Sequence, residues 1–306
     1  MIALRNILVD EDAVATHHPA LEQALGLARR CGARVTIVDV LPWVPSGVRH
    51  FVTPELEKEL IEHRRERLGA MAKDVSDIPI TTELLRGRPA SAVIQEVVRG
   101  NHDLLVRSHG RDLAVLPRPF GAIDMELLRQ CPCPVWLIGP RGPAARWRIL
   151  AAIRATNAEP EERELNATIL EWALTLKSFG DAELSVLQAW TPYGASLLRS
   201  RMPPDEFSEF IETSRRTEHE ALSQFLKPYT ERLGDVTVEL AHGEPEDAIT
   251  GFVESHGVDV VVMGTVARTG IAGLVMGNTA ERVLQRLRGS VLAVKPPGFR
   301  GPTGKG

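Results

Sequence analysis

Cysteine is scarce in this chain of 306 residues, which has only Cys31, Cys131 and Cys133. An odd number of cysteines without paired spacing argues against a disulfide framework and is typical of a reducing compartment. Cys131 and Cys133 form a C-x-C rather than a C-x-x-C, and the apolar run Val135-Trp-Leu-Ile138 follows directly. This order favours a turn that leads into a strand, and a thiol or metal site is the alternative.

An excess of positive charge is also missing. Lysine and arginine total 36 against 40 aspartates and glutamates, for a net charge of −4 at pH 7, which argues against electrostatic binding of nucleic acid. No apolar run is long enough to span a membrane, and Met1-Ile-Ala-Leu-Arg5 leads straight into a predicted strand, without a signal peptide. We therefore expect a cytoplasmic protein that binds neither nucleic acid nor membrane.

The signatures of several enzyme classes do not occur either. The chain contains no H-E-x-x-H, G-x-S-x-G or P-loop motif. His17 and His18 follow Asp10, Glu11 and Asp12, which suggests a metal site. Because no second cluster of ligands supports such a site, we interpret this segment as a solvated loop.

What the chain does contain is an internal repeat. Gly87 and Gly243 lie 156 positions apart (243 − 87 = 156), and the same offset relates four further pairs: Pro89 and Pro245, Asp103 and Asp259, Gly121 and Gly277, Pro140 and Pro296. The beginnings match at another offset, since Asn6-Ile-Leu-Val9 resembles Arg148-Ile-Leu-Ala151. This pattern predicts two similar domains, at 1–140 and 148–296, joined by a linker at 141–145 and followed by a flexible Gly/Pro-rich tail at 297–306.

Each half alternates short apolar runs with helical patterns. We predict strands near 5–11, 34–40, 79–85, 103–107 and 134–138, then 148–154, 183–189, 235–241, 258–263 and 290–294. We predict helices near 19–31, 54–74, 89–100 and 122–130, then 161–178, 204–232, 245–255 and 278–288. This alternation is typical of an α/β fold with a parallel, doubly wound sheet, whose ligand crevice lies at the carboxyl ends of the strands.

The most informative stretch is residues 258–281. The run Val258 to Met263 predicts a buried strand, a glycine-rich loop follows, and Gly277-Asn-Thr279 opens the last helix. Backbone N–H groups and a helix dipole at one point suit a phosphate, to which Thr265, Asn278 and Thr279 can donate. The alternative is an ordinary capped helix, with Asn278 as N-cap and Glu281 completing a capping box. The spacing alone leaves both interpretations open.

Three motifs carry a resemblance to a known family: Met263-Gly-Thr-Val-Ala-Arg-Thr-Gly270, Gly277-Asn-Thr-Ala-Glu281 and Cys131-Pro-Cys-Pro-Val135. With them, the whole chain resembles a tandem universal stress protein (UspA superfamily) of the E type. The resemblance implies two tandem doubly wound parallel five-stranded sheets of the HUP-like fold. It also brings the family's ATP motif G-x-x-G-x(9)-G-[ST], in which Gly264 and Gly277 match, whereas Ala267 and Asn278 replace the middle glycine and the final hydroxyl residue.

By the same resemblance, the second half is a candidate nucleotide site. The family's adenine and ribose contacts fall on Ala152, Ile153, Arg154 and Ala189, where Arg154 stands in place of the usual aspartate and offers a cation instead of a carboxylate. The phosphate contacts fall on the loop after the fourth strand and the helix start: Met263, Gly264, Thr265, Ala267, Arg268, Gly277, Asn278 and Thr279.

The first half shows the opposite pattern. Asp12 and Val40 match the adenine and ribose positions, but the loop 108–120 contains Pro117 and Pro119, each of which removes a backbone donor. Asp124 falls in the first turn of the next helix, where its charge satisfies the helix dipole and repels a phosphate. We therefore expect the first half not to hold a triphosphate.

Two functions follow from the resemblance. The first is a stress-response regulator that binds ATP or a related adenine nucleotide, with Mg²⁺, in its second half, and that hydrolyses it slowly at most. The second is an interaction scaffold that binds no nucleotide, whose crevices hold a partner protein or another small ligand. In both cases the last strands, 135–138 and 290–294, are expected to pair within the chain as an internal pseudo-dimer, and a further homodimer is compatible with the pattern.

Overall fold

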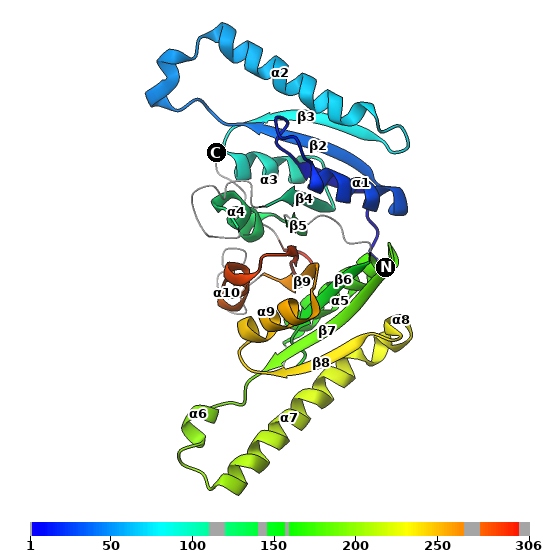
Figure 1. Ribbon diagram of the computed structural model, residues 1–306, viewed down its shortest axis with the longest axis vertical. Coiled ribbons are helices and arrows are strands. Elements are labelled where there is room, and N and C mark those ends of the chain that lie inside the picture. Colours follow the sequence, from blue (N-terminus) through cyan, green and yellow to red (C-terminus); the bar gives the residue numbers. More distant parts are fainter. Residues whose placement is uncertain (1, 110–119, 140–145, 157–158, 266–275, 300–306) are drawn as a thin grey trace.

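The computed structural model describes residues 2–109, 120–139, 146–156, 159–265 and 276–299. Its centre is a single sheet of ten strands in the order β3-β2-β1-β4-β5-β10-β9-β6-β7-β8, which runs along the molecule (Figure 1). The strands of the first half are β1 (Asn6–Asp10), β2 (Arg34–Leu41), β3 (Ile80–Arg86), β4 (Leu104–Ser108) and β5 (Val135–Ile138). Those of the second half are β6 (Trp147–Ile153), β7 (Ala182–Trp190), β8 (Thr237–His242), β9 (Val260–Gly264) and β10 (Ser290–Val294). All ten predicted strands are present.

The helices of the first half are α1 (Pro19–Cys31), η1 (Ser46–Phe51), α2 (Pro54–Lys73), α3 (Pro89–Arg99) and α4 (Ala122–Gln130). Those of the second half are α5 (Pro160–Ser178), α6 (Ala195–Leu198), α7 (Pro204–Leu226), η2 (Lys227–Tyr229), α8 (Thr230–Leu233), α9 (Pro245–His256) and α10 (Asn278–Arg286). Six of these helices begin with a proline, whose fixed φ and missing N–H cost nothing in a first turn. None of the helices described is both long and apolar enough to cross a bilayer.

One prediction about the helices is wrong. The helix expected over 204–232 is three pieces, α7, η2 and α8, and the break contains Pro228. A proline inside a helix removes one backbone hydrogen bond and clashes with the preceding turn, so the chain tightens into a 3₁₀ turn there. The short segments η1 and α6 were not predicted.

The two halves meet through their last strands, as expected. Within each half the strands pair in parallel, whereas β5 and β10 pair antiparallel, with Leu137 opposite Val291, Trp136 opposite Leu292 and Val135 opposite Ala293. The internal pseudo-dimer is therefore present, and its two five-stranded sheets form one continuous sheet. The linker at 141–145 lies outside the described residues, as does the tail beyond residue 299.

Two apolar cores cover the two faces of the sheet. One contains Ile7, Trp136 and Leu292 together with residues of α1 and α5, and the other contains Leu8 and Val291 together with residues of α4 and α10. Neighbouring strand residues point to opposite faces, so a strand buried on both sides is mostly apolar, and its few polar residues need partners. Each core spans both halves, which ties the halves together across the β5–β10 pair.

Candidate functional site

The strand register identifies equivalent positions in the two crevices. In the first half Asp10 of β1 lies beside Arg107 of β4, and in the second half Ala152 of β6 lies beside Met263 of β9. These residues sit near the carboxyl ends of the central strands, where α/β sheets bind ligands. The charged pair of the first crevice is thus replaced by two apolar residues in the second.

Arg107 holds the first crevice together. Its guanidinium donates to Asp10 and, through Nε, to Asp124 Oδ1 at 3.0 Å, while the N–H of Gly121 donates to Asp124 Oδ2 at 2.9 Å. Both carboxylates are buried. Burial lowers the pKa of Arg107, but the charges of Asp10 and Asp124 raise it by more, so the arginine keeps its proton. Asp124 therefore satisfies the start of α4 internally, as the sequence predicted.

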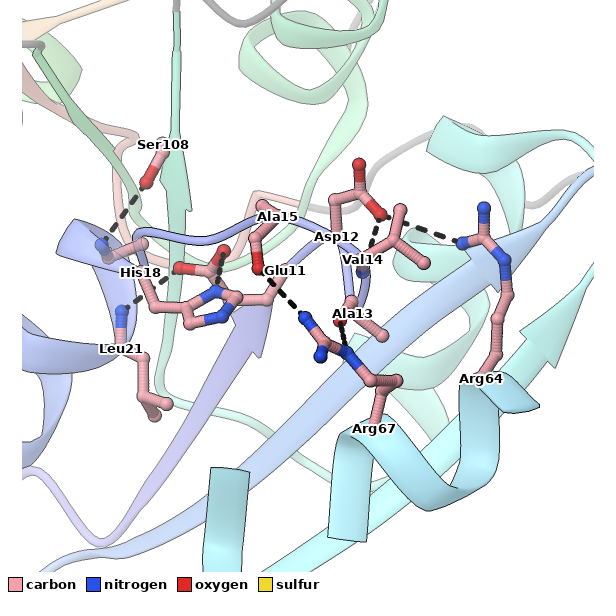
Figure 2. Close-up of polar contacts among 11 residues, drawn as sticks. Glu11, Asp12, Ala13, Val14, Ala15, His18, Leu21, Arg64, Arg67 and Ser108 are labelled. Carbon is pink, nitrogen blue, oxygen red and sulfur yellow. Dashed lines mark hydrogen bonds and ion pairs between the residues drawn. The ribbon is translucent and has the colours of Figure 1, made fainter. Parts of the chain in front are cut away.

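The loop before α1 is also held by side chains, which Figure 2 shows. Glu11, only 1% exposed, accepts from the backbone N–H of Leu21 at 3.2 Å and pairs with His18 Nδ1 at 3.3 Å. Ser108 Oγ accepts from the N–H of Ala20 at 3.1 Å. The expectation of a solvated loop is therefore wrong for Glu11, because the first turn of α1 has no acceptor of its own and takes these two. No group of three or more potential metal ligands occurs among the residues described.

Asp12, which matches the family's aspartate, accepts from the N–H of Val14 at 3.1 Å and faces Arg64 of α2 (Figure 2). Arg64 Nη1 lies 3.7 Å from Asp12 Oδ1 and 2.6 Å from Asp39 Oδ2. Burial raises the pKa of Asp39 although Arg64 opposes this shift. Arg67 donates to the carbonyl of Ala13 at 3.1 Å. The charged side chains named here are thus paired within the first crevice. Val40, the matching apolar position, is half-buried. Pro117 and Pro119 lie outside the described residues.

The start of α10 differs from that of α4. Gly277 is the N-cap residue of α10, and a glycine has no side chain that could accept from the first helical N–H groups. Asn278 is already helical. The capping box, which was the alternative interpretation, is therefore not formed: Asn278 lies one position past the cap, and Glu281 Oε1 accepts from Arg129 Nη2 of the first half at 3.2 Å. By the repeat offset of 156, Ala280 of the second half is equivalent to Asp124 of the first. Asn278 and Thr279 are exposed.

Part of the predicted phosphate cradle is already hydrogen-bonded. The N–H of Thr265 donates to Val294 O at 3.3 Å, and that of Gly277 donates to Thr265 O at 3.1 Å. The hydroxyl of Thr265, which the sequence offered as a phosphate donor, is buried and donates to Leu128 O at 3.4 Å. At Gly264 a Cβ would stand 2.7 Å from Leu165 Cδ2, so the loop passes close to α5. Ala267 and Arg268 fall outside the described residues.

The predicted adenine side is bounded by α5. The side chain of Asn166 accepts from Arg154 N at 3.1 Å and donates to Arg154 O at 2.5 Å, which fixes the backbone after β6. The side chain of Arg154 itself is exposed. Ala152 and Ala189 are half-buried and lie on the same face of the sheet, where the resemblance puts the base, whereas Ile153 is buried in the core on the opposite face.

A buried polar network beside this surface was missed by sequence reasoning. Gln188, fully buried in β7, accepts from Ala155 N at 2.8 Å and donates to Thr156 Oγ1 at 2.8 Å and to Glu218 Oε2 at 2.7 Å. The one signal in the sequence is a glutamine inside the apolar run 184–190. Such a residue must find partners, and α7 supplies one of them.

The chain resembles known proteins over its full length. The family model described as "Universal stress protein family" matches residues 3–139 and 162–295. Universal stress protein E of Escherichia coli strain K12 is 27% identical over 315 residues, covering 99% of this chain and 97% of that protein. The protein of the same name from Photorhabdus laumondii is 26% identical over 311 residues, covering 99% and 98%.

Solved structures share the same tandem architecture. A functionally unknown protein from Pseudomonas aeruginosa PAO1 aligns with a TM-score of 0.71 at 26% identity, covering 96% of this chain and 93% of that one. A universal stress protein from Archaeoglobus fulgidus aligns with a TM-score of 0.62 at 16% identity, covering 95% and 98%. The second likeness shows the fold alone.

Proposed function

This chain belongs to the universal stress protein family, and from that premise we propose that it is a stress-response regulator whose second half binds ATP or a related adenine nucleotide, with little or no catalysis. The observation that carries the proposal is the contrast between the two helix starts. Asp124 accepts from the N–H of Gly121 at the start of α4, whereas the equivalent residue of α10 is Ala280, and the carboxylate in the first turn of α10, Glu281, pairs with Arg129 of the first half. A helix start whose N–H groups are not bound by a carboxylate of the chain favours an external anion.

The proposed site combines this helix start with the apolar surface after β6 and β7. The phosphates would lie against the first turn of α10, with Asn278 and Thr279 as donors and the exposed cation of Arg154 nearby in the crevice. The adenine would lie on Ala152 and Ala189, and Ile153, whose side chain faces the opposite core, would contribute only its backbone. The proposed loop contacts are Met263, Gly264, Thr265, Ala267, Arg268 and Gly277. The hydroxyl of Thr265 is not a phosphate donor, because it donates to the carbonyl of Leu128. Mg²⁺ would accompany the nucleotide.

One observation favours the second function, an interaction scaffold without nucleotide. Two of the loop's amides, those of Thr265 and Gly277, already have backbone acceptors, so fewer donors face a phosphate than the glycine-rich sequence suggests. Under this alternative the second crevice binds a partner protein or another small ligand.

Calorimetric titration of the full chain with ATP and Mg²⁺ separates the two functions. We expect saturable heat at one nucleotide per chain. The variant Ala280→Asp copies the first half and should weaken binding at least about tenfold, because a carboxylate on the first turn competes with the phosphate. The matched variant Ala280→Asn, of the same size but neutral, should stay within about threefold of the parent.

One result would exclude nucleotide binding. If the parent protein shows neither heat nor a thermal shift at millimolar ATP, the scaffold alternative stands. Equal losses in the Asp and Asn variants would mean that size, not charge, governs this position.

A further inference from the structure

The second feature of chemical interest is a pair of thiols that the proposed nucleotide site does not use. Cys131 ends α4 and Cys133 precedes β5, and their sulfurs lie 3.6 Å apart. Cys131 is fully buried and Cys133 is 8% exposed. The sequence favoured a turn into a strand here, and the turn is present. The contact between the two thiols goes beyond that prediction, because C-x-C spacing by itself does not bring sulfurs together.

The segment between the thiols is stiff. Pro132 lies between the cysteines and Pro134 follows them, and each proline fixes its own φ. The N–H of Cys131 donates to Leu127 O at 2.9 Å, and the carbonyl of Pro134 accepts from Leu105 N at 3.0 Å. Both ends of the segment are therefore tied to regular structure, which keeps the two sulfurs near each other.

A buried cation from the other half of the chain lies against this segment. Lys295 follows β10, is 7% exposed, and donates from Nζ to the carbonyl of Cys131. Burial lowers the pKa of Lys295 to about 8, while the charges of Cys131 and Cys133 act to raise it. Its ammonium also lies 4.6 Å from the ring centre of Phe299. A cation beside two thiols favours a thiolate, which is the reactive form of cysteine.

The two thiols differ in how they hold the proton. Burial raises the pKa of Cys131, but the hydrogen bond from Cys133 and the charge of Lys295 outweigh burial and leave it below its usual value. The same hydrogen bond, together with burial, holds the pKa of Cys133 well above its usual value. Cys131 is therefore the more readily ionised of the two thiols.

We propose that Cys131 and Cys133 are a redox-modification site, which a small peroxide such as hydrogen peroxide oxidises to a disulfide within the chain. The Cys131 thiolate attacks one peroxide oxygen, the O–O bond breaks, and the departing hydroxide takes a proton from solvent to become water. The sulfur of Cys133 then attacks that of the Cys131 sulfenic acid, and its proton leaves with the hydroxyl as a second water. Two thiols are oxidised and one peroxide is reduced to two waters.

Burial selects the oxidant. A bulky disulfide such as oxidised glutathione must bring its own sulfur to the attacking thiolate, and neither cysteine of the pair is open to a molecule of that size. Hydrogen peroxide is little larger than water. Closing the bond requires the sulfurs to approach by about 1.5 Å, since a disulfide is about 2.05 Å long. Cys31, at the end of α1 and half-buried, has no such partner in the described chain and serves as the internal control.

Peptide mass mapping tests the site directly. Trypsin releases Cys131 and Cys133 together in the peptide 130–141 and Cys31 separately in the peptide 31–34. The full chain is treated with hydrogen peroxide, capped with N-ethylmaleimide and digested. We expect the peptide 130–141 to lose about 2 Da and to carry no cap, while the peptide 31–34 remains capped. Treatment with oxidised glutathione should leave the peptide 130–141 doubly capped.

Three variants complete the test. Cys31→Ser should keep the mass loss in full, and Cys133→Ser should abolish it and leave Cys131 as a higher oxide. Lys295→Met should slow disulfide formation at pH 7 by about tenfold, because the thiolate fraction falls without the cation. A doubly capped peptide 130–141 after millimolar peroxide overturns the proposal, and so does a disulfide that links this peptide between two chains. Because neither readout involves nucleotide, both are independent of the function proposed above.

Discussion

Trp136 of β5 lies directly opposite Leu292 of β10, and these residues occupy the same position, 156 apart, in their two halves. A residue that faces its own equivalent across an antiparallel pair marks the axis of a pseudo-twofold, as in a symmetric dimer. The two edge strands that such a domain would otherwise expose are covered by each other. Both apolar cores, which span the two halves, therefore depend on the pairing of strands β5 and β10.

Removing the indole at this axis should be costly. Trp136 is 1% exposed and packs edge-on against Trp147 at 5.4 Å between ring centres. We expect Trp136→Ala to lower the free energy of unfolding by about 3–5 kcal/mol, measured by urea denaturation. The matched change Trp43→Ala, at a site 63% exposed, should cost about 1 kcal/mol or less. Equal losses at the two sites would contradict the role of the β5–β10 pair.

Arg107 should matter for stability rather than for ligand binding. Arg107→Met leaves the buried carboxylates of Asp10 and Asp124 without their cation, which should lower the free energy of unfolding by about 3–5 kcal/mol. Arg29→Met, which removes an arginine paired with Asp77 on the surface, should change it by at most about 1 kcal/mol. Chemical denaturation at neutral pH measures both, and a mild effect at Arg107 would show that the crevice admits water.

Lys295 should make stability rise with pH. Its pKa is about 8 in the folded chain and about 10.4 in the unfolded chain, so between these values the unfolded state binds the extra proton. The free energy of unfolding therefore increases as pH rises through this window, by about 1.6 kcal/mol from pH 8 to 9.5, and the trend fades below about pH 7. The comparison is urea unfolding with and without Lys295→Met, both in a Cys131→Ser, Cys133→Ser background that removes thiol ionisation; because the two cysteines raise the pKa of Lys295, the window should begin at a lower pH in this background. Parallel pH profiles for the two proteins would refute this account.

Gly139 should tolerate no side chain. A Cβ there would stand 3.1 Å from the backbone carbon of Gly289 and 3.2 Å from the nitrogen of Ser290, where the halves join. We expect Gly139→Ala to cost about 1–3 kcal/mol, because backbone cannot move aside as a side chain can. Gly26→Ala, in α1 with open space around it, should instead stabilise by about 0.5–1 kcal/mol. Thermal unfolding distinguishes the opposite signs.

Much of the fold was readable from local pattern. Apolar runs between helical segments located every strand, and the offset of 156 identified the repeat, whereas the pairing of the last strands followed from the family resemblance. The role of Asp124 was also predictable, because a carboxylate in the first turn of a helix can accept from the unpaired N–H groups at the helix start. The break at Pro228 was available from the same rules, since a proline deep in a helical pattern interrupts it.

The candidate site was less readable because its contacts join distant segments. Glu11 reaches the start of α1, and its neighbours in sequence do not mark it as buried. Gln188 of β7 stands in an apolar run, but nothing near it in sequence identifies its partner, Glu218 of α7. The partner of Thr265 is a carbonyl in the other half, 137 positions away. Glu281 likewise pairs with Arg129 across the two halves. Tertiary partners decided these details.

The continuous sheet has one more consequence. Two identical single-domain chains that associate through their last strands must have identical crevices, and such a dimer dissociates on dilution. In this chain the partners are covalently fixed as one of each kind at any concentration, so the crevice with Arg107 always accompanies the crevice with Ala280. Substitutions that disable one crevice are then never copied into the other, and a division of labour between structural anchor and receptor can persist.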